Sequence, residues 1–106
     1  MARAEIHAGN CGYTTIVHAE ANGRQSTRLH IESDCKAIRR LAEHLTEVNT
    51  FNEISFRGEF PEVLKRGHEF CSHAACPVPV GIIKALEVAN GLALPGEATI
   101  AITRED

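Results

Sequence analysis

Alternation of apolar and polar side chains over the first 32 residues constrains the fold more than any other feature of the chain. Such a period of two is typical of strands with one buried face. The strongest turn signal is the "NG" at 22–23, which favours a tight β-hairpin between two of these stretches. The pattern comprises a first stretch around Ala4, Ile6 and Ala8, a turn at 9–12, a second stretch at 13–21, the hairpin at 22–23 and a third stretch at 24–32. We therefore predict a three-stranded antiparallel meander.

Apolar residues with helical spacing follow the meander. Asp34 begins a stretch with helical periodicity to Val48, and two later stretches begin near prolines, which suit a first helical turn. The predicted elements are helices at 34–48 (with Ile38, Leu41, Ala42, Leu45 and Val48 buried), 61–68 and 77–90 (with Ile82, Ile83, Leu86 and Ala89 buried), a short strand or extended link at 53–57 and a closing strand at 97–103. Gly67 is expected to fray the end of the second helix.

The order of these elements predicts the α+β class. We expect one domain over residues 1–106, with the meander and the C-terminal strand in one layer and two to three helices packed on one face. Apolar residues make up 43% of the chain and charged residues 24%, as in ordinary soluble globular proteins.

Charge and hydropathy exclude two classes of partner. The net charge is −3, and Lys and Arg do not gather into the basic face that nucleic-acid binding requires. No stretch approaches the roughly 20 apolar residues of a membrane span, and no signal peptide is visible. We therefore expect a cytoplasmic protein that binds neither nucleic acid nor membrane.

Four cysteines, Cys11, Cys35, Cys71 and Cys76, are the candidate functional residues. In the reducing cytoplasm, such a set indicates metal or redox chemistry before structural disulfides. Cys11 lies in the first turn and Cys35 just after the third strand, so antiparallel pairing brings both to the same edge of the sheet. Cys35 and Cys76 also lie at helix starts, which favour thiolates, and four residues separate Cys71 from Cys76. We expect all four to bind one metal centre.

The spacing favours an iron–sulfur cluster over zinc. It reads C-x23-C-x35-C-x4-C and lacks the C-x2-C knuckles usual in structural zinc sites. A [4Fe–4S] cluster also takes four thiolates and tolerates dispersed ligands, and Pro77 directly after Cys76 matches the "C-P" ending of ferredoxin motifs. His68 and His73 could replace a cysteine but are interpreted as solvated loop residues. The remaining histidines are interpreted as the polar face of the sheet (His7, His18 and His30) and the solvent side of the first helix (His44).

Several alternatives remain open. The cysteines could be inert or disulfide-bonded. With zinc, the chain would be a metal-stabilised module that binds a protein through its sheet or its last helix. As a thiol/disulfide redox protein, it would use Cys76 as the attacking thiolate, Cys71 as the resolving cysteine and His73 as the base. No paired carboxylates, phosphate-binding glycine loop or Ser/His/Asp arrangement supports another enzyme class.

The order of cysteines and elements resembles the TSCPD domain, a small four-cysteine module that also occurs at the C-terminus of some ribonucleotide reductases. "SDCKAIRRL" resembles its cysteine at a helix start, and "ACPV" (75–78) corresponds to its Ser-Cys-Pro-Asp signature, with Ala75 and Val78 in place of Ser and Asp. The chain also resembles an uncharacterised group of small four-cysteine proteins of anaerobic microbes. The resemblance covers residues 9–90 and implies that Cys11, Cys35, Cys71 and Cys76 bind metal.

Overall fold

The alternating N-terminal stretches form three long strands in the computed structural model, which describes residues 1–106. The sheet is antiparallel throughout, in the order β1-β2-β3-β4. Its strands are β1 (Ala2–His7), β2 (Thr14–Asn22), β3 (Ser26–Ser33) and β4 (Glu47–Asn49). Val17 of β2 lies between Ala4 and Ile31 on the same face. The predicted meander is therefore confirmed.

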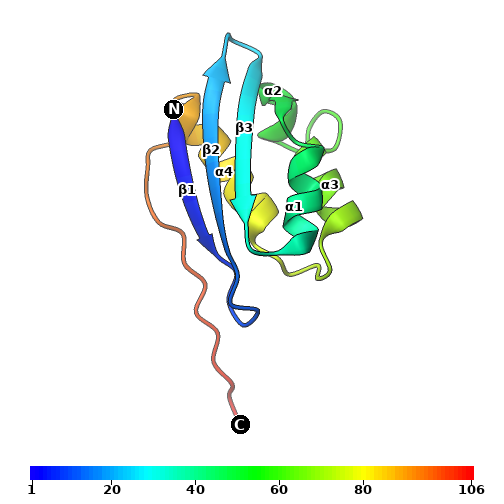
Figure 1. Ribbon diagram of the computed structural model, residues 1–106. Helices are drawn as coiled ribbons and strands as arrows, with labels where there is room; N and C mark the ends of the chain where they lie inside the picture. The colour runs from blue at the N-terminus through cyan, green and yellow to red at the C-terminus, as the bar shows by residue number, and fades with distance from the viewer.

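Helices cover one face of this sheet, and the other face is open (Figure 1). They are α1 (Lys36–Glu43), α2 (Thr50–Glu53), α3 (Glu62–Phe70) and α4 (Val78–Ala89). α4 packs on β1 and β2, α1 packs on β3, and α3 contacts both of these helices. The result is the expected two-layer α+β fold. None of the helices is long and apolar enough to cross a membrane.

Aliphatic side chains fill the space between the layers. No Phe or Tyr belongs to the fully buried set, so the core relies on branched aliphatic side chains and alanine. The buried set is Val17, Ala19, Leu29, Ile38, Leu41, Leu45, Val48, Val63, Val78, Ile82, Ala85 and Leu86. The predicted stripes of the first and last helices are thus largely confirmed as core.

The prediction of one helix over 34–48 is wrong in its second half. α1 ends at Glu43, and Val48 belongs to β4, where it pairs with Thr27 of β3. A buried Thr27 Oγ1–Thr50 Oγ1 hydrogen bond of 2.7 Å lies beside this ladder. Leu45 and Val48 are buried in either conformation, so the apolar spacing could not distinguish a helix from a turn and a strand.

The predicted C-terminal strand is absent, and the segment predicted as a short strand or an extended link forms no strand. Residue 53 ends α2, and residues 54–57 are irregular, so 53–57 is not a strand. Residues 97–103 are extended but have no ladder partner, so the C-terminal strand is not formed, and β4 supplies the fourth strand instead. A strand needs a neighbour for its backbone groups, and local β-propensity does not supply one.

Two glycines allow the helices to approach their neighbours closely. A methyl group on Gly67 would meet Pro79 Cγ at 2.8 Å, so this glycine lets α3 lie against α4. Gly67 therefore packs within α3, which continues to Phe70, and does not fray its end. Similarly, a methyl group on Gly81 would overlap Ile6, and the bare backbone lets α4 lie on β1.

Candidate functional site

Three connections that carry cysteines lie at one end of the molecule. They are the β1–β2 turn, the β3–α1 junction and the α3–α4 loop, which occupy the lower end in Figure 1. The β3–α1 junction and the β1–β2 turn are joined there by a hydrogen bond from the Asp34 N–H to the Thr14 carbonyl, at 3.5 Å. The loops of Cys11 and Cys35 therefore lie at the same edge of the sheet. That the two cysteines are themselves neighbours stays a prediction.

Cys35 occupies the N-cap position of α1 and is half-buried. The Cys35 N–H donates to Ser33 Oγ at 3.1 Å, and Ser33 Oγ is hydrogen-bonded to Thr15 Oγ1 of β2 at 2.7 Å. Arg39 Nε donates to the Ser33 carbonyl at 2.8 Å. These contacts hold the backbone of Cys35 between the sheet and the first turn of α1.

Cys71 and Cys76 bracket the α3–α4 loop, and both are half-buried against the core. The N–H of Cys71 donates to the Gly67 carbonyl at 2.9 Å, which makes Cys71 the C-cap of α3. The N–H of Cys76 donates to the His73 carbonyl at 3.2 Å, and the next residue, Pro77, is the N-cap of α4. The packing of α3 on α4 therefore sets where these two thiols lie.

The Cys71 thiol is affected by two other cysteines. Burial raises the pKa of Cys71 to about 12, and the charge and hydrogen bonding of Cys76 and the charge of Cys35 add to the effect. A like charge disfavours the thiolate, so charge on Cys76 or Cys35 opposes ionisation of Cys71. We refer to Cys35, Cys71 and Cys76 as the three-thiol group.

Cys11 lies at the same end but outside the three-thiol group. It is exposed, and it is not among the groups that shift the pKa of Cys71. Its turn is built on glycines with positive φ, Gly9 at 97° and Gly12 at 76°, and closes with the Gly12 N–H donating to the Gly9 carbonyl at 2.9 Å. Only glycine adopts such angles without strain, so the sequence "GNCG" places this thiol at the tip of a turn.

The arrangement has chemical consequences and limits. All four cysteines are free thiols, and no three or more His, Cys, Asp or Glu side chains are arranged as a ready-made metal site. If a thiophilic cation binds, the thiols release their protons to solvent, and the cation offsets the repulsion between the resulting thiolates.

The histidines predicted as bystanders lie away from the thiols or on the surface. His68 and His73 are exposed as predicted, but His68 lies on α3 and not in a loop. His44 is also exposed, but its ring stacks on Phe70 with 4.9 Å between centroids and 15° between planes. This stack joins the end of α1 to the end of α3, one residue before Cys71, and the sequence pattern did not indicate it.

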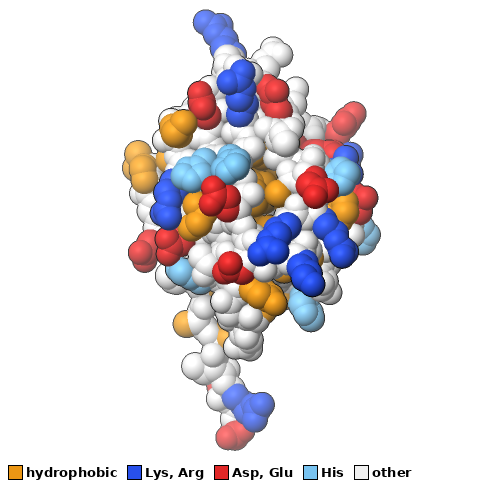
Figure 2. All heavy atoms as spheres, viewed as in Figure 1, with side chains coloured by type: hydrophobic (Ala, Val, Ile, Leu, Met, Phe, Trp, Pro, Cys, Tyr) orange, Lys and Arg blue, Asp and Glu red, His pale blue; other side chains and the backbone are white.

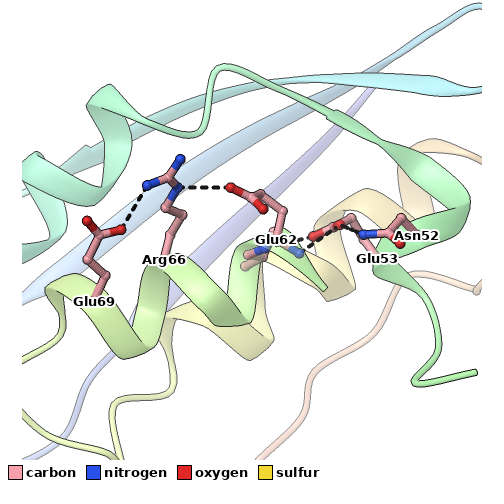
Figure 3. A network of polar contacts seen from close by, with 6 residues as sticks. Asn52, Glu53, Glu62, Arg66 and Glu69 are labelled. Carbon is pink, nitrogen blue, oxygen red and sulfur yellow. Dashed lines mark hydrogen bonds and ion pairs between the residues drawn. The ribbon is translucent and has the colours of Figure 1, made fainter. Parts of the chain in front are cut away.

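Glu53 is a second residue that the sequence analysis missed. This carboxylate is only 2% exposed, and it accepts hydrogen bonds from the N–H groups of Glu62 at 2.9 Å and Val63 at 2.7 Å (Figure 3). Asn52 Nδ2 donates to it as well, at 3.1 Å. Helix N-termini have unpaired N–H groups, and Pro61 cannot cap α3 with its side chain, so Glu53 supplies the acceptor from α2. The only signal in the sequence is an acidic residue shortly before a proline that begins a helix.

The open face of the sheet carries the strand histidines, as predicted. His18 and His30 pair directly across β2 and β3, with 6.1 Å between ring centroids. Figure 2 shows histidine, acidic and basic side chains intermixed on this face. His30 Nε2 lies 2.9 Å from Glu32 Oε1, and His7 Nε2 lies 3.0 Å from Glu5 Oε2. These contacts make the face polar and of mixed charge.

The fold and the site together define a small two-layer α+β protein with free thiols gathered at one end of its sheet. The chain belongs to the DUF6951 family, a family of unknown function, whose model matches residues 2–102. No curated protein and no solved structure matches the chain. The matching family is not the TSCPD domain, so that resemblance stays a prediction.

Proposed function

We propose that the protein is a small metalloprotein that binds one metal centre through Cys11, Cys35, Cys71 and Cys76. The observation that supports this proposal is that Cys35, Cys71 and Cys76 lie at or next to the ends of α1, α3 and α4 at one end of the molecule, with Cys11 on a turn at the same end. Ligands from four dispersed positions in the chain thus reach one region.

An iron–sulfur cluster fits this arrangement better than zinc. A zinc ion holds its four sulfurs at about 2.3 Å, which requires a tight tetrahedron. A [4Fe–4S] cluster is a larger cage and accepts ligands that are farther apart. Cys11 stands outside the three-thiol group, on an exposed turn, so a larger centre needs less movement of that turn. The cluster would serve electron transfer or redox sensing, in the cytoplasm, with a redox partner of unidentified nature.

Anaerobic purification of the full chain, followed by iron, sulfide and zinc analysis and an absorbance spectrum, tests the proposal. We expect about four irons and four sulfides per chain and a broad visible absorbance that bleaches on reduction, as for a [4Fe–4S] centre. Cys35→Ser, Cys71→Ser and Cys76→Ser should each lose most of the iron. A protein that holds one zinc and no iron contradicts the cluster and supports the zinc-stabilised module.

Matched variants separate ligands from bystanders. His73→Ala lies in the same loop as Cys71 and Cys76 and should keep the full iron content, because its side chain is exposed. Cys11→Ser should lower the iron content or shift the spectrum towards a three-thiolate cluster. If reduced protein binds no metal and readily forms a Cys71–Cys76 disulfide, the metalloprotein proposal fails and the thiol/disulfide alternative replaces it.

A further inference from the structure

Two segments of the chain could each pair with a further β-strand, but neither has such a neighbour in the structure. The first is the outer edge of β1, which pairs only with β2, so one side of Ala2–His7 has no ladder partner. The second is the C-terminal tail, residues 91–106, which is exposed throughout. Exposed strand edges bind additional strands through their backbone groups, and proteins normally cover or block them.

The tail has the composition of a strand. Residues 97–103, "EATIAIT", alternate so that Ala98, Ile100 and Ile102 share one face. Ile100 is 81% exposed and Ile102 is 87% exposed, which is unusual for two neighbouring isoleucines on one face. The family match extends to residue 102, so it includes this segment. We call residues 97–103 the tail strand.

Within one chain, the tail strand does not complete the sheet. In the view of Figure 1, the tail leaves α4 near the start of β1, heads in the same direction as β1 and continues past its end. The last backbone hydrogen bond towards the C-terminus is from the Leu92 N–H to the Glu87 carbonyl. Pairing in this direction would be parallel, and with the apolar faces aligned it would set Ile102 beside Ile6 and Ala98 beside Ala2.

The opposite direction gives a better match of side-chain sizes. β1 presents Ala2, Ala4 and Ile6 on the face that α4 covers, and these residues are half-buried. An antiparallel tail strand sets Ile102 beside Ala2, Ile100 beside Ala4 and Ala98 beside Ile6, so that each large side chain meets a small one. On the open face, the same register sets Glu97 beside His7, which adds a charge-compatible pair.

We propose that two copies of the chain form a dimer in which the tail strand of each copy adds, antiparallel, to the β1 edge of the other. Each chain carries both a free β1 edge and a tail strand. In a dimer with a two-fold axis, each tail strand therefore pairs with the β1 edge of the other chain. The tail strand extends the sheet to five strands in each copy and buries Ile100 and Ile102 against the flank of α4. This inference stands independently of the metal centre, because β1 and the tail strand contain no cysteine.

Sedimentation equilibrium of the reduced, metal-free protein tests the dimer, with Cys11→Ser as the background so that the exposed thiol cannot link two chains. We expect a dimer that weakens at least about tenfold with Ile100→Lys, because the lysine would be forced onto the apolar face. Thr99→Lys adds the same charge on the opposite face, beside Glu5, and should leave the dimer intact. A chain that ends at Gly96 should be a monomer that still unfolds cooperatively, because every helix and strand lies before residue 90.

Nuclear Overhauser contacts in a mixture of isotope-labelled and unlabelled chains identify the partner of the tail strand. Contacts from Ile100 to Ala4 between labelled and unlabelled chains are the expected result. The same contacts within a single chain overturn the proposal, because the tail would then fold back on its own β1. A monomer at all concentrations, or a dimer that survives removal of the tail strand, also overturns it.

Discussion

At the scale of single residues, the buried carboxylate of Glu53 and the thiol of Cys71 lie at the two ends of α3, the helix that leads into the cysteine loop. Glu53 satisfies the backbone N–H groups at the start of α3, and Cys71 lies at the end of the same helix. Near the middle of α3, Arg66 contacts Glu62 at 3.0 Å and Glu69 at 2.8 Å (Figure 3). The ion pairs of Arg66 contribute little to stability. The Glu53 carboxylate contributes more, because it is buried and no other side chain caps α3.

We predict that Glu53→Gln lowers the free energy of unfolding by about 1–3 kcal/mol, because an amide is a weaker acceptor and brings an unpaired donor into a buried position. Urea unfolding measures this change. Glu59→Gln, at an exposed glutamate in the preceding loop, should change stability by less than about 0.5 kcal/mol. Equal effects of the two substitutions would show that Glu53 does not cap α3.

The raised pKa of Cys71 predicts a pH dependence of stability in the metal-free, reduced protein. In the unfolded chain this thiol ionises near its ordinary pKa of 9.0, whereas in the fold it stays protonated until about pH 12. The unfolded state therefore gains stability as the pH rises through this window, and the native protein loses it. Below pH 9 the group has no such effect.

Unfolding at pH 8 and at pH 10 under reducing conditions measures this loss. Cys71→Ala should show a smaller loss between the two pH values than the unsubstituted protein. Cys11→Ala, which removes an exposed thiol, should keep the full loss. An identical pH dependence in all three proteins would contradict the assignment to Cys71.

At the scale of secondary-structure elements, the contact between α3 and α4 determines the geometry of the Cys71–Cys76 loop. Gly67 allows this contact because its backbone faces the Pro79 ring. The His44–Phe70 stack fixes the other side of α3 against α1. The start and end of the last helix could be predicted from Pro77, its apolar stripe and the "NG" at 90–91. Which helices pack against each other could not be predicted, because the periodicity of one helix does not identify its neighbour.

We predict that Gly67→Ala destabilises the protein by about 1–2 kcal/mol, since overlap with a rigid proline ring outweighs the better helix propensity of alanine. The same substitution should weaken metal binding, because it moves α3 and α4 apart. Thermal unfolding and iron content measure the two effects. Gly58→Ala is the matched control, because a methyl there would meet only Asn52 Oδ1, at 4.0 Å. A stable Gly67→Ala protein with full iron content would contradict this account.

At the scale of the whole molecule, the sheet brings the ends of distant segments together. The hairpin returns β3 to the turn that carries Cys11, and the helical layer brings Cys71 and Cys76 to Cys35. The four thiols therefore belong to the ends of α1, α3 and α4 and to the β1–β2 turn, all at one end of the molecule. A bound metal centre would cross-link most of the fold at that end, which makes binding and stability interdependent.

We predict that metal removal lowers the melting temperature. A ligand that binds only the native state, at 100 times its dissociation constant, stabilises a protein by about 2.7 kcal/mol, and for a domain of this size each kcal/mol corresponds to about 4–8 °C. Calorimetry of anaerobically purified protein before and after chelation should therefore show a decrease of about 10–20 °C. Cys76→Ser should melt at the same temperature with or without chelator. An unchanged melting temperature in the native sequence would contradict a tightly bound centre.

The sequence alone determined the meander, the last two helices and the shared edge for Cys11 and Cys35, because alternation, turn residues and antiparallel pairing are local or follow from strand order. Tertiary structure decided the rest. Val48 is a strand residue because it pairs with Thr27 of β3. Glu53 is a capping residue because α3 begins nine residues later, at Glu62. The tail strand has strand propensity but no neighbour within its own chain. Each of these outcomes depends on a partner group that is distant in the sequence, and no local pattern encodes where that partner lies.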